Sequence, residues 1–309
     1  MLDTPIVATP FKLDCFDAEL ALRTTPEDWQ RILVLRNHAN FMQGLAAYQD
    51  LMPAYFSDNI ILNKIVTEAW RFEILVYMLY LYDIGDPENP RTGLTVTNLQ
   101  RICARQKCAS SGRVLAILGM MGIAGYLNRG KSEFDSRVVL LKPTQKFISI
   151  VEGWNRRIFQ IIDAILPEAG LAYCQETEPR FGWDMRRNGA ETLLDGWKLL
   201  DPFPEVVHFV SRDAGWMLLL TCVAESLRLG HGKEIVPVSI DLKSFGARFG
   251  VSRTHLRRLL ESAYTENLLD APPKNGTNIV LSPRLVASFL ACMASELGNY
   301  YLWALRGRA

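Results

Sequence analysis

The densest group of side chains that could do chemistry is a basic run between Gly246 and Leu260. No acidic residue occurs in it, and the first one after it is Glu261. Arginine presents a planar fork of donors that matches a phosphate or the O6 and N7 atoms of guanine. The run therefore predicts a surface that binds nucleic acid. Its basic residues are Arg248, Arg253, His255, Arg257 and Arg258.

These arginines fall on a segment with the apolar spacing of an amphipathic helix. The face predicted to pack inward consists of Leu256, Leu259, Leu260 and Ala263. At 3.6 residues per turn, Arg253, Thr254 and Arg257 then face outward, and Ser252 begins the first turn, where free backbone N–H groups can meet phosphate. The alternative is a solvated face whose arginines only form surface ion pairs.

A weaker version of the pattern occurs earlier in the chain. Ser110, Ser111 and Arg113 open a predicted helix, but the sequence then continues as VLAILGMMGIAG, which offers few polar side chains. Two roles stay open for this helix: direct contact with DNA, or a packing or dimer surface. Each helix is followed by a predicted hairpin with basic residues at its tip. These are Arg129, Lys131 and Arg137 in the first hairpin, diluted by Glu133 and Asp135, and Lys274 in the second.

The two regions are similar over about 45 residues, and this similarity predicts the architecture. Leu99 matches Leu242 at an offset of 143, and Ser110 matches Ser252 at 142. The Lys142-Pro143 and Ser282-Pro283 pairs align at 140. Small gaps at turns and hairpin tips explain the drift, because loop length is free to vary there.

Each copy is predicted to form helix, short turn, helix and a two-stranded hairpin. In the first copy the second helix runs from Ser110 to about Ala124, and a long helix starts at Pro143 after the hairpin. The fold class is mainly α with small β hairpins that act as wings, in tandem winged helix-turn-helix domains. This order of elements can place the second helix in the DNA major groove and the hairpin tip on the flanking backbone.

The predicted segments are an N-terminal helical segment (1–58), a first winged-helix domain (59–166), an aromatic-rich connector (167–203) and a second winged-helix domain with a C-terminal helix (204–309). Within the first segment, one helix is predicted from Thr25 to about Met52-Pro53. The connector is predicted to contain a helix from Gly189 to Leu200, and its tryptophans favour a packed segment over a free linker. A pocket for a small-molecule effector competes there with plain core packing.

The overall composition excludes several classes of protein. Among 309 residues, 49% are hydrophobic and 22% charged, which is typical of a folded globular chain. Lys and Arg number 34 against 33 Asp and Glu, so the chain is no histone-like polycation. The first 15 residues lack the pattern of a secretory signal, and no apolar run reaches the roughly 20 residues of a membrane span. Six cysteines without a CxxC pair favour a reduced, cytoplasmic protein.

Catalytic, cofactor and metal motifs are missing from the sequence. Neither a phosphate-binding glycine loop nor a zinc-protease or serine-hydrolase signature occurs, and the four histidines are far apart. We therefore expect no enzyme, no cofactor and no metal site. Cys103 and Cys108 flank the turn between the helices of the first copy, where a redox-sensing pair competes with two small buried hydrophobes.

Both copies resemble the winged-helix domains of MarR-type transcriptional regulators. The resemblance rests on helices before and after the motif and on wings that end in VVLLKPTQKF and NIVLSPRLV, where a strand runs into a Pro-containing helix start. It implies contacts with double-stranded DNA. The residues it implies are Ser110, Ser111, Arg113, Ser252, Arg253, Thr254 and Arg257 on the helices, and Arg129, Lys131 and Lys274 on the wings.

The prediction from sequence is a cytoplasmic, sequence-specific DNA-binding transcriptional regulator. MarR-type proteins have one such domain and dimerise, so a chain with two is either a monomeric pseudo-dimer or a homodimer. Two alternatives stay open: a plasmid-type replication initiator that binds repeated origin sites, and a winged-helix scaffold for protein interactions.

Overall fold

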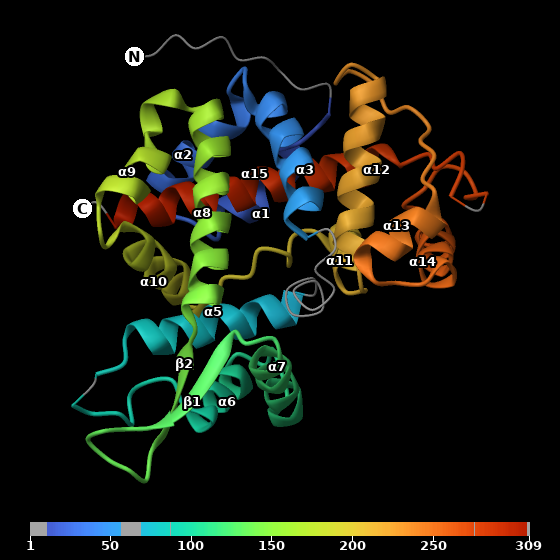
Figure 1. Ribbon diagram of the computed structural model, residues 1–309. Helices are drawn as coiled ribbons and strands as arrows, with labels where there is room; N and C mark the ends of the chain where they lie inside the picture. Colours follow the sequence, from blue (N-terminus) through green and yellow to red (C-terminus); the bar gives the residue numbers. More distant parts are fainter. Residues whose placement is uncertain (1–10, 57–68, 87, 275, 308–309) are drawn as a thin grey trace. The chain divides into compact units, whose positions relative to one another are not determined.

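The computed structural model describes residues 11–56, 69–86, 88–274 and 276–307, and this part of the chain is mainly helical (Figure 1). The chain divides into two compact units, each of which draws on three stretches of sequence. The larger unit comprises Met1–Asn63, Ile158–Leu171 and Lys198–Leu302. The smaller unit comprises Lys64–Arg157, Ala172–Trp197 and Trp303–Ala309. No helix among the described residues is long and apolar enough to cross a bilayer.

The smaller unit is built around helix α5, which contacts α6, α10 and strand β2. Its buried side chains include Tyr77, Met78, Leu99, Ile117 and Phe147. The antiparallel pair β1–β2 forms the one sheet of the described residues, and Figure 1 shows it beside α6 and α7. The elements are α5 (Ala69–Asp83), α6 (Val96–Arg105), α7 (Ser111–Ile123), β1 (Leu127–Lys131), β2 (Val139–Pro143), α8 (Gln145–Ile165), whose residues from Ile158 on belong to the larger unit, α9 (Leu171–Thr177), whose first residue does too, and α10 (Phe181–Leu194).

The larger unit is held by α12, which contacts α3 and α11, and by the α13–α14 pair. Glu205 is buried at the start of α11 and accepts hydrogen bonds from Arg284 (2.5 Å) and Ser288 (3.0 Å) of α15. Its helices are η1 (Asp14–Phe16), α1 (Asp17–Ala21), α2 (Pro26–Asn37), α3 (Phe41–Phe56), η2 (Pro167–Ala169), α11 (Pro204–Val210), α12 (Gly215–Leu229), α13 (Leu242–Phe249), α14 (Arg253–Thr265) and α15 (Pro283–Arg306).

The structure repeats one backbone hydrogen-bond pattern in the two units, here called repeat 1 (residues 94–144) and repeat 2 (residues 238–282). In repeat 1 the N–H of Cys108 donates to the carbonyl of Cys103 (3.1 Å), around Lys107 at a φ of 55°. In repeat 2 the N–H of Val251 donates to the carbonyl of Gly246 (2.9 Å), around a residue at a φ of 72°. The left-handed residue, Lys107 or Gly250, ends the first helix and starts the turn.

The second helix of each repeat is capped and packed in the same way. Ser110 and Ser252 are the N-caps, and their hydroxyl oxygens accept from the N–H three residues on, at 3.4 and 3.1 Å. Every residue predicted for the inward face of α14 is buried, and its counterpart on α7 is buried too. The matched buried pairs, all at an offset of 142, are Val114 and Leu256, Ile117 and Leu259, Leu118 and Leu260, and Met121 and Ala263.

The hairpins of the two repeats differ in regularity and in length. In repeat 1, Leu127 pairs with Pro143 and Lys131 with Val139, and the N–H of Leu141 also donates to the carbonyl of Leu94. Repeat 2 has isolated bridges instead of strands. They join Val238 to Ile279, Leu269 to Leu281 and Lys274 to Thr277.

The alignment of the two prolines is wrong by two residues. The N–H of Thr144 donates to the carbonyl of Tyr126 (2.9 Å) and that of Ser282 to the carbonyl of Leu268 (3.0 Å), in each case the residue just before the hairpin. The hydroxyl oxygens of both residues also cap the helix that follows. Their offset is 138, against 142 for the helices before the hairpin, so the hairpin of repeat 2 is four residues shorter than that of repeat 1. Pro143 accordingly ends β2, whereas Pro283 is the first residue of α15.

Two further expectations about elements are corrected. The helix predicted from Thr25 to Met52-Pro53 is broken at His38, whose backbone is extended and whose ring accepts from the N–H of Asn40 (3.1 Å), and Pro53 lies within α3. The helix predicted in the connector from Gly189 to Leu200 is α10, which begins eight residues earlier and ends at Leu194, and whose Arg186 forms a two-point ion pair with Asp83 of α5 (2.9 and 3.2 Å). The predicted start of the domain at residues 59–68 lies outside the described residues.

The matched turns generate a stability prediction. A side chain at a left-handed position costs about 1 kcal/mol, so Lys107→Gly is expected to raise the free energy of unfolding by up to about 1 kcal/mol, and Gly250→Ala to lower it by about as much. Urea unfolding followed by circular dichroism measures both. Shifts in the same direction would mean that the two turns are not equivalent.

Candidate nucleic-acid interface

The outer face of α14 in repeat 2 is exposed and basic. Arg253, Thr254, Arg257 and Arg258 are all exposed. Arg257 lies 3.5 Å from Glu261, an exposed i,i+4 pair of the kind that is worth little in water. Within the described residues, neither Arg253 nor Arg258 forms an ion pair. The side chains predicted to face outward on this helix thus remain available to an anionic ligand.

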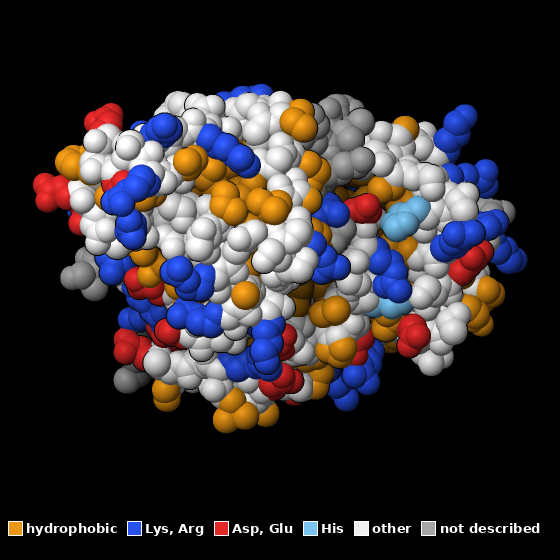
Figure 2. Space-filling model, turned by 90° about the horizontal axis from the view of Figure 1, so that it is seen from below, with side chains coloured by type: hydrophobic (Ala, Val, Ile, Leu, Met, Phe, Trp, Pro, Cys, Tyr) orange, Lys and Arg blue, Asp and Glu red, His pale blue; other side chains and the backbone are white. Residues whose placement is uncertain are grey.

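The neighbouring residues extend this basic surface. Lys243 and Arg248 of α13 are exposed, and Figure 2 shows Lys and Arg side chains gathered at the right-hand end of the view, where α13 and α14 lie. Asp241 lies at the start of α13 and is held by its own turn, because it accepts from the hydroxyl of Ser244 (2.6 Å), which lowers its pKa.

His255 has a structural role in α14. Its Nε2 atom donates to the carbonyl of Asp213 (2.9 Å), in the loop before α12, and its backbone N–H is the donor to the Ser252 cap. Ser252 is exposed, but its hydroxyl is engaged by that cap. Both residues therefore orient the helix, while Arg253, Thr254 and Arg257 point away from the core.

In repeat 1, α7 presents a different surface. The guanidinium of Arg113 stacks over the ring of Trp70 at 5.0 Å, so the one basic side chain of this helix is drawn onto α5. Ser110 serves as the cap and Ser111 is exposed. The rest of the outer face is apolar or bare: Leu115 is 47% exposed and Ile123 88% exposed. This helix offers a nucleic acid little to bind.

The hairpin of repeat 1 carries the basic residues predicted for its wing. Arg129 and Lys131 are exposed on β1, and because they are two residues apart they lie on the same face of the strand. Lys274 of repeat 2 is exposed beside its bridge to Thr277, and the next residue of that tip lies outside the described residues.

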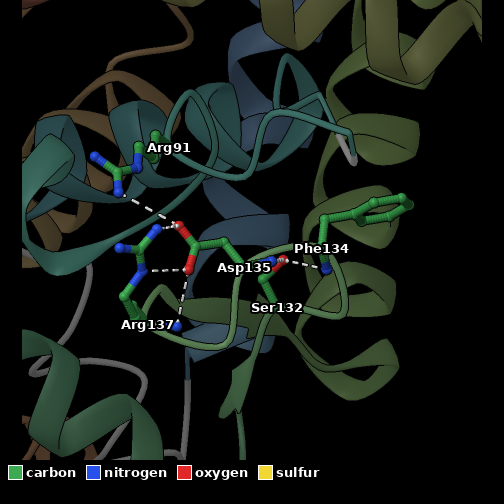
Figure 3. A network of polar contacts seen from close by, with 5 residues as sticks. All are labelled: Arg91, Ser132, Phe134, Asp135 and Arg137. Carbon is green, nitrogen blue, oxygen red and sulfur yellow. Dashed lines mark hydrogen bonds and ion pairs between the residues drawn. The ribbon is translucent and has the colours of Figure 1, made fainter.

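A network of polar contacts holds the tip of the hairpin in repeat 1 (Figure 3). The carboxylate of Asp135 accepts from the Nε (3.0 Å), Nη2 (3.2 Å) and backbone N–H (3.1 Å) of Arg137, and from Nη2 of Arg91 (3.3 Å). The bonds from Arg137 lower the pKa of Asp135 to about 2. Its charge is therefore offset within the tip and does not oppose an anionic partner.

Several of these features of the site were not predicted from the sequence. The engagement of Arg113 by Trp70 joins residues 43 positions apart, and no local pattern announces it. Arg91 binds Asp135 at the hairpin tip, yet it is distant from the hairpin in sequence. The turn former Ser132, which accepts from the N–H groups of Phe134 (3.1 Å) and Asp135 (3.4 Å), is the signal that could have identified an ordered tip.

Other chemistry is weakly represented in the described residues. They contain no group of His, Cys, Asp and Glu arranged to hold a metal ion. Cys103 is fully buried, and its hydrogen bond with Cys108, together with burial, raises the pKa of its thiol, which disfavours the reactive thiolate.

Comparisons of the chain with protein-family models, with curated proteins and with solved structures find no match.

The cap of α14 gives a prediction. Ser252→Ala removes the acceptor for the N–H of His255 and should lower the free energy of unfolding by about 1 kcal/mol. Ser252→Asp keeps an acceptor and adds a charge that favours the helix N-terminus, so its stability should equal or exceed that of the wild type. Urea unfolding compares the three proteins. Equal losses in both variants would show that the hydroxyl has another role.

Proposed function

We propose that this chain is a sequence-specific DNA-binding transcriptional regulator with two winged helix-turn-helix repeats, and that repeat 2 reads the DNA bases. One observation carries the proposal: the second helix of repeat 2 exposes Arg253, Arg257 and Arg258 from a capped, well-packed scaffold. Arginines fixed on such a helix can form two-point contacts with guanine in the major groove.

The repeated backbone supports the winged-helix assignment. In both repeats two helices contact each other through a turn with one left-handed residue, and a hairpin follows the second helix. Only the second helix of repeat 2 combines this geometry with an arginine face. The first turn of α14 adds the hydroxyl of Thr254, which can contact a phosphate or a base edge.

The outer face of α7 supports a different role for repeat 1. With Arg113 on Trp70 and with Leu115 and Ile123 exposed, this helix is better suited to contact protein than to read bases. We assign base reading to repeat 2 alone, and we assign contact with the DNA backbone to the wing residues Arg129, Lys131 and Lys274. A plasmid-type initiator would use the same geometry, so the genes beside this one distinguish initiation from regulation.

The proposal is tested by removing the arginine face. Arg253→Ala or Arg257→Ala should cost about 1–3 kcal/mol of binding if the residue reads a guanine, and should relax the preference at one base pair. Arg113→Ala should cost less, because its guanidinium is held on Trp70. Binding is measured by a mobility shift on duplexes selected from a random pool, at several salt concentrations.

Arg228→Ala is a matched control, because Arg228 is an exposed arginine of the same unit that is paired with Glu225 on α12. It should leave DNA affinity unchanged. If the double variant at Arg253 and Arg257 remains folded and binds DNA as well as this control, the arginine face is only a solvated surface. The chain would then be better explained as a protein-interaction scaffold.

The difference between the repeats also predicts the form of the binding site. Base contacts are assigned to repeat 2 alone and backbone contacts to the wing of repeat 1, so one chain should protect a site with unequal halves, of which one carries the sequence preference. Footprinting gives the symmetry of the site, and sedimentation of the complex gives the number of chains. A symmetric footprint with two chains would instead show a homodimer in which one repeat of each chain is idle.

A further inference from the structure

A large aromatic side chain projects from the tip of the hairpin in repeat 1. The ring of Phe134 is 63% exposed, and Figure 3 shows it pointing away from the polar network of the tip. Burying a phenylalanine normally gains about 1.5–3 kcal/mol, so exposing one on a loop forgoes a sizeable stabilisation. On the tip of a hairpin, the exposed ring lies where a partner could bury it.

The backbone that carries the ring is fixed on both sides. The hydroxyl of Ser132 accepts from the N–H of Phe134 itself, and the N–H of Ser132 donates to the carbonyl of Val138 (2.9 Å), which closes the tip across its base. On the other side, Asp135 is bound by Arg137 and Arg91. The ring is thus presented by an ordered loop, and little conformational entropy is lost when it enters a partner.

The wing that carries the ring has more basic than acidic side chains. Glu133 and Asp135 flank Phe134 in the chain, and the charge of Asp135 is already offset by its two arginines. Both of these arginines are well exposed, Arg137 at 81% and Arg91 at 67%, so their remaining N–H donors face solvent. The basic side chains of the hairpin are Arg129, Lys131, Arg137 and Lys142, and Arg91 binds its tip from the loop before α6.

We infer that Phe134 is an apolar wedge that enters the minor groove of double-stranded DNA and partly unstacks one base step, while the basic side chains of the wing hold the neighbouring phosphates. The inference rests on the proposed function and adds to it a site and a mode of binding. Apolar side chains that insert in this way kink the duplex, most easily at flexible pyrimidine–purine steps.

The charge of the wing favours DNA over a protein as the partner. A protein-binding aromatic is commonly surrounded by other apolar groups that exclude water. Phe134 lies instead on a wing that carries more cations than anions, and the complement of such a wing is a line of phosphates. The wing would therefore read the deformability of the sequence, in contrast to the base contacts proposed for α14.

The test uses the full chain and a duplex of about 30 base pairs selected from a random pool, with 2-aminopurine at each pyrimidine–purine step in turn and a fluorophore pair at the ends. Wild-type protein should raise the 2-aminopurine emission at one step and bring the ends closer. Phe134→Ala should abolish both signals and weaken binding about tenfold, which is within the range for loss of a base–aromatic contact. Phe134→Leu should retain most of both signals, because leucine is also an effective wedge.

Tyr173→Ala is the matched control. Tyr173 is 72% exposed on α9 of the same unit, away from the wing in sequence, and its removal should change neither signal. If the wild-type chain binds no duplex, the proposed function fails and the wedge with it. If Phe134→Ala binds with unchanged emission and end-to-end distance, the wedge alone is overturned. Loss of self-association in Phe134→Ala with unaltered DNA signals would likewise overturn it and make the ring a protein contact.

Discussion

The turn between the paired helices is the constraint on which both repeats depend. One left-handed residue, Lys107 or Gly250, lets the next N–H reach back to a carbonyl five residues earlier, and this bond fixes the direction in which the second helix leaves. The serine cap then begins that helix in register, so four apolar residues meet the core and the opposite face meets solvent. In repeat 2 the close approach is so tight that a β-carbon on Gly246 would lie 2.5 Å from the carbonyl oxygen of Val251.

Much of this could be predicted from the sequence because the signals are local. Caps, left-handed positions and the apolar period of 3.6 residues identify α7 and α14, and a constant offset of 142 relates them. The hairpin ends were harder to predict, because a shared proline suggested a match that the cap residues Thr144 and Ser282 contradict. The break at His38 and the ion pair from Arg186 to Asp83 depend on contacts that form only in the folded chain.

The same limit applies to the candidate site. The exposed arginines of α14 follow from helix geometry, since each of them is placed by residues on its own helix. The position of the Arg113 side chain depends on Trp70 of another helix, and the charge balance of the hairpin tip depends on Arg91 from a loop before α6. The formal net charge of +1 indicates neither of these contacts, because a nearly neutral total is compatible with local basic surfaces.

The interleaving of the two units along the chain has a consequence for how the protein is made. Residues of the smaller unit leave the ribosome between the first and last stretches of the larger one, so helices α2 and α3 are complete long before α12 and α15 exist to cover them. Their apolar faces, which include the buried Leu35 and Tyr48, stay uncovered during synthesis until α12 and α15 have been made. Such a delay exposes apolar surface to aggregation and gives chaperones time to act. The larger unit thus closes late, and the nascent chain is most vulnerable over its first third.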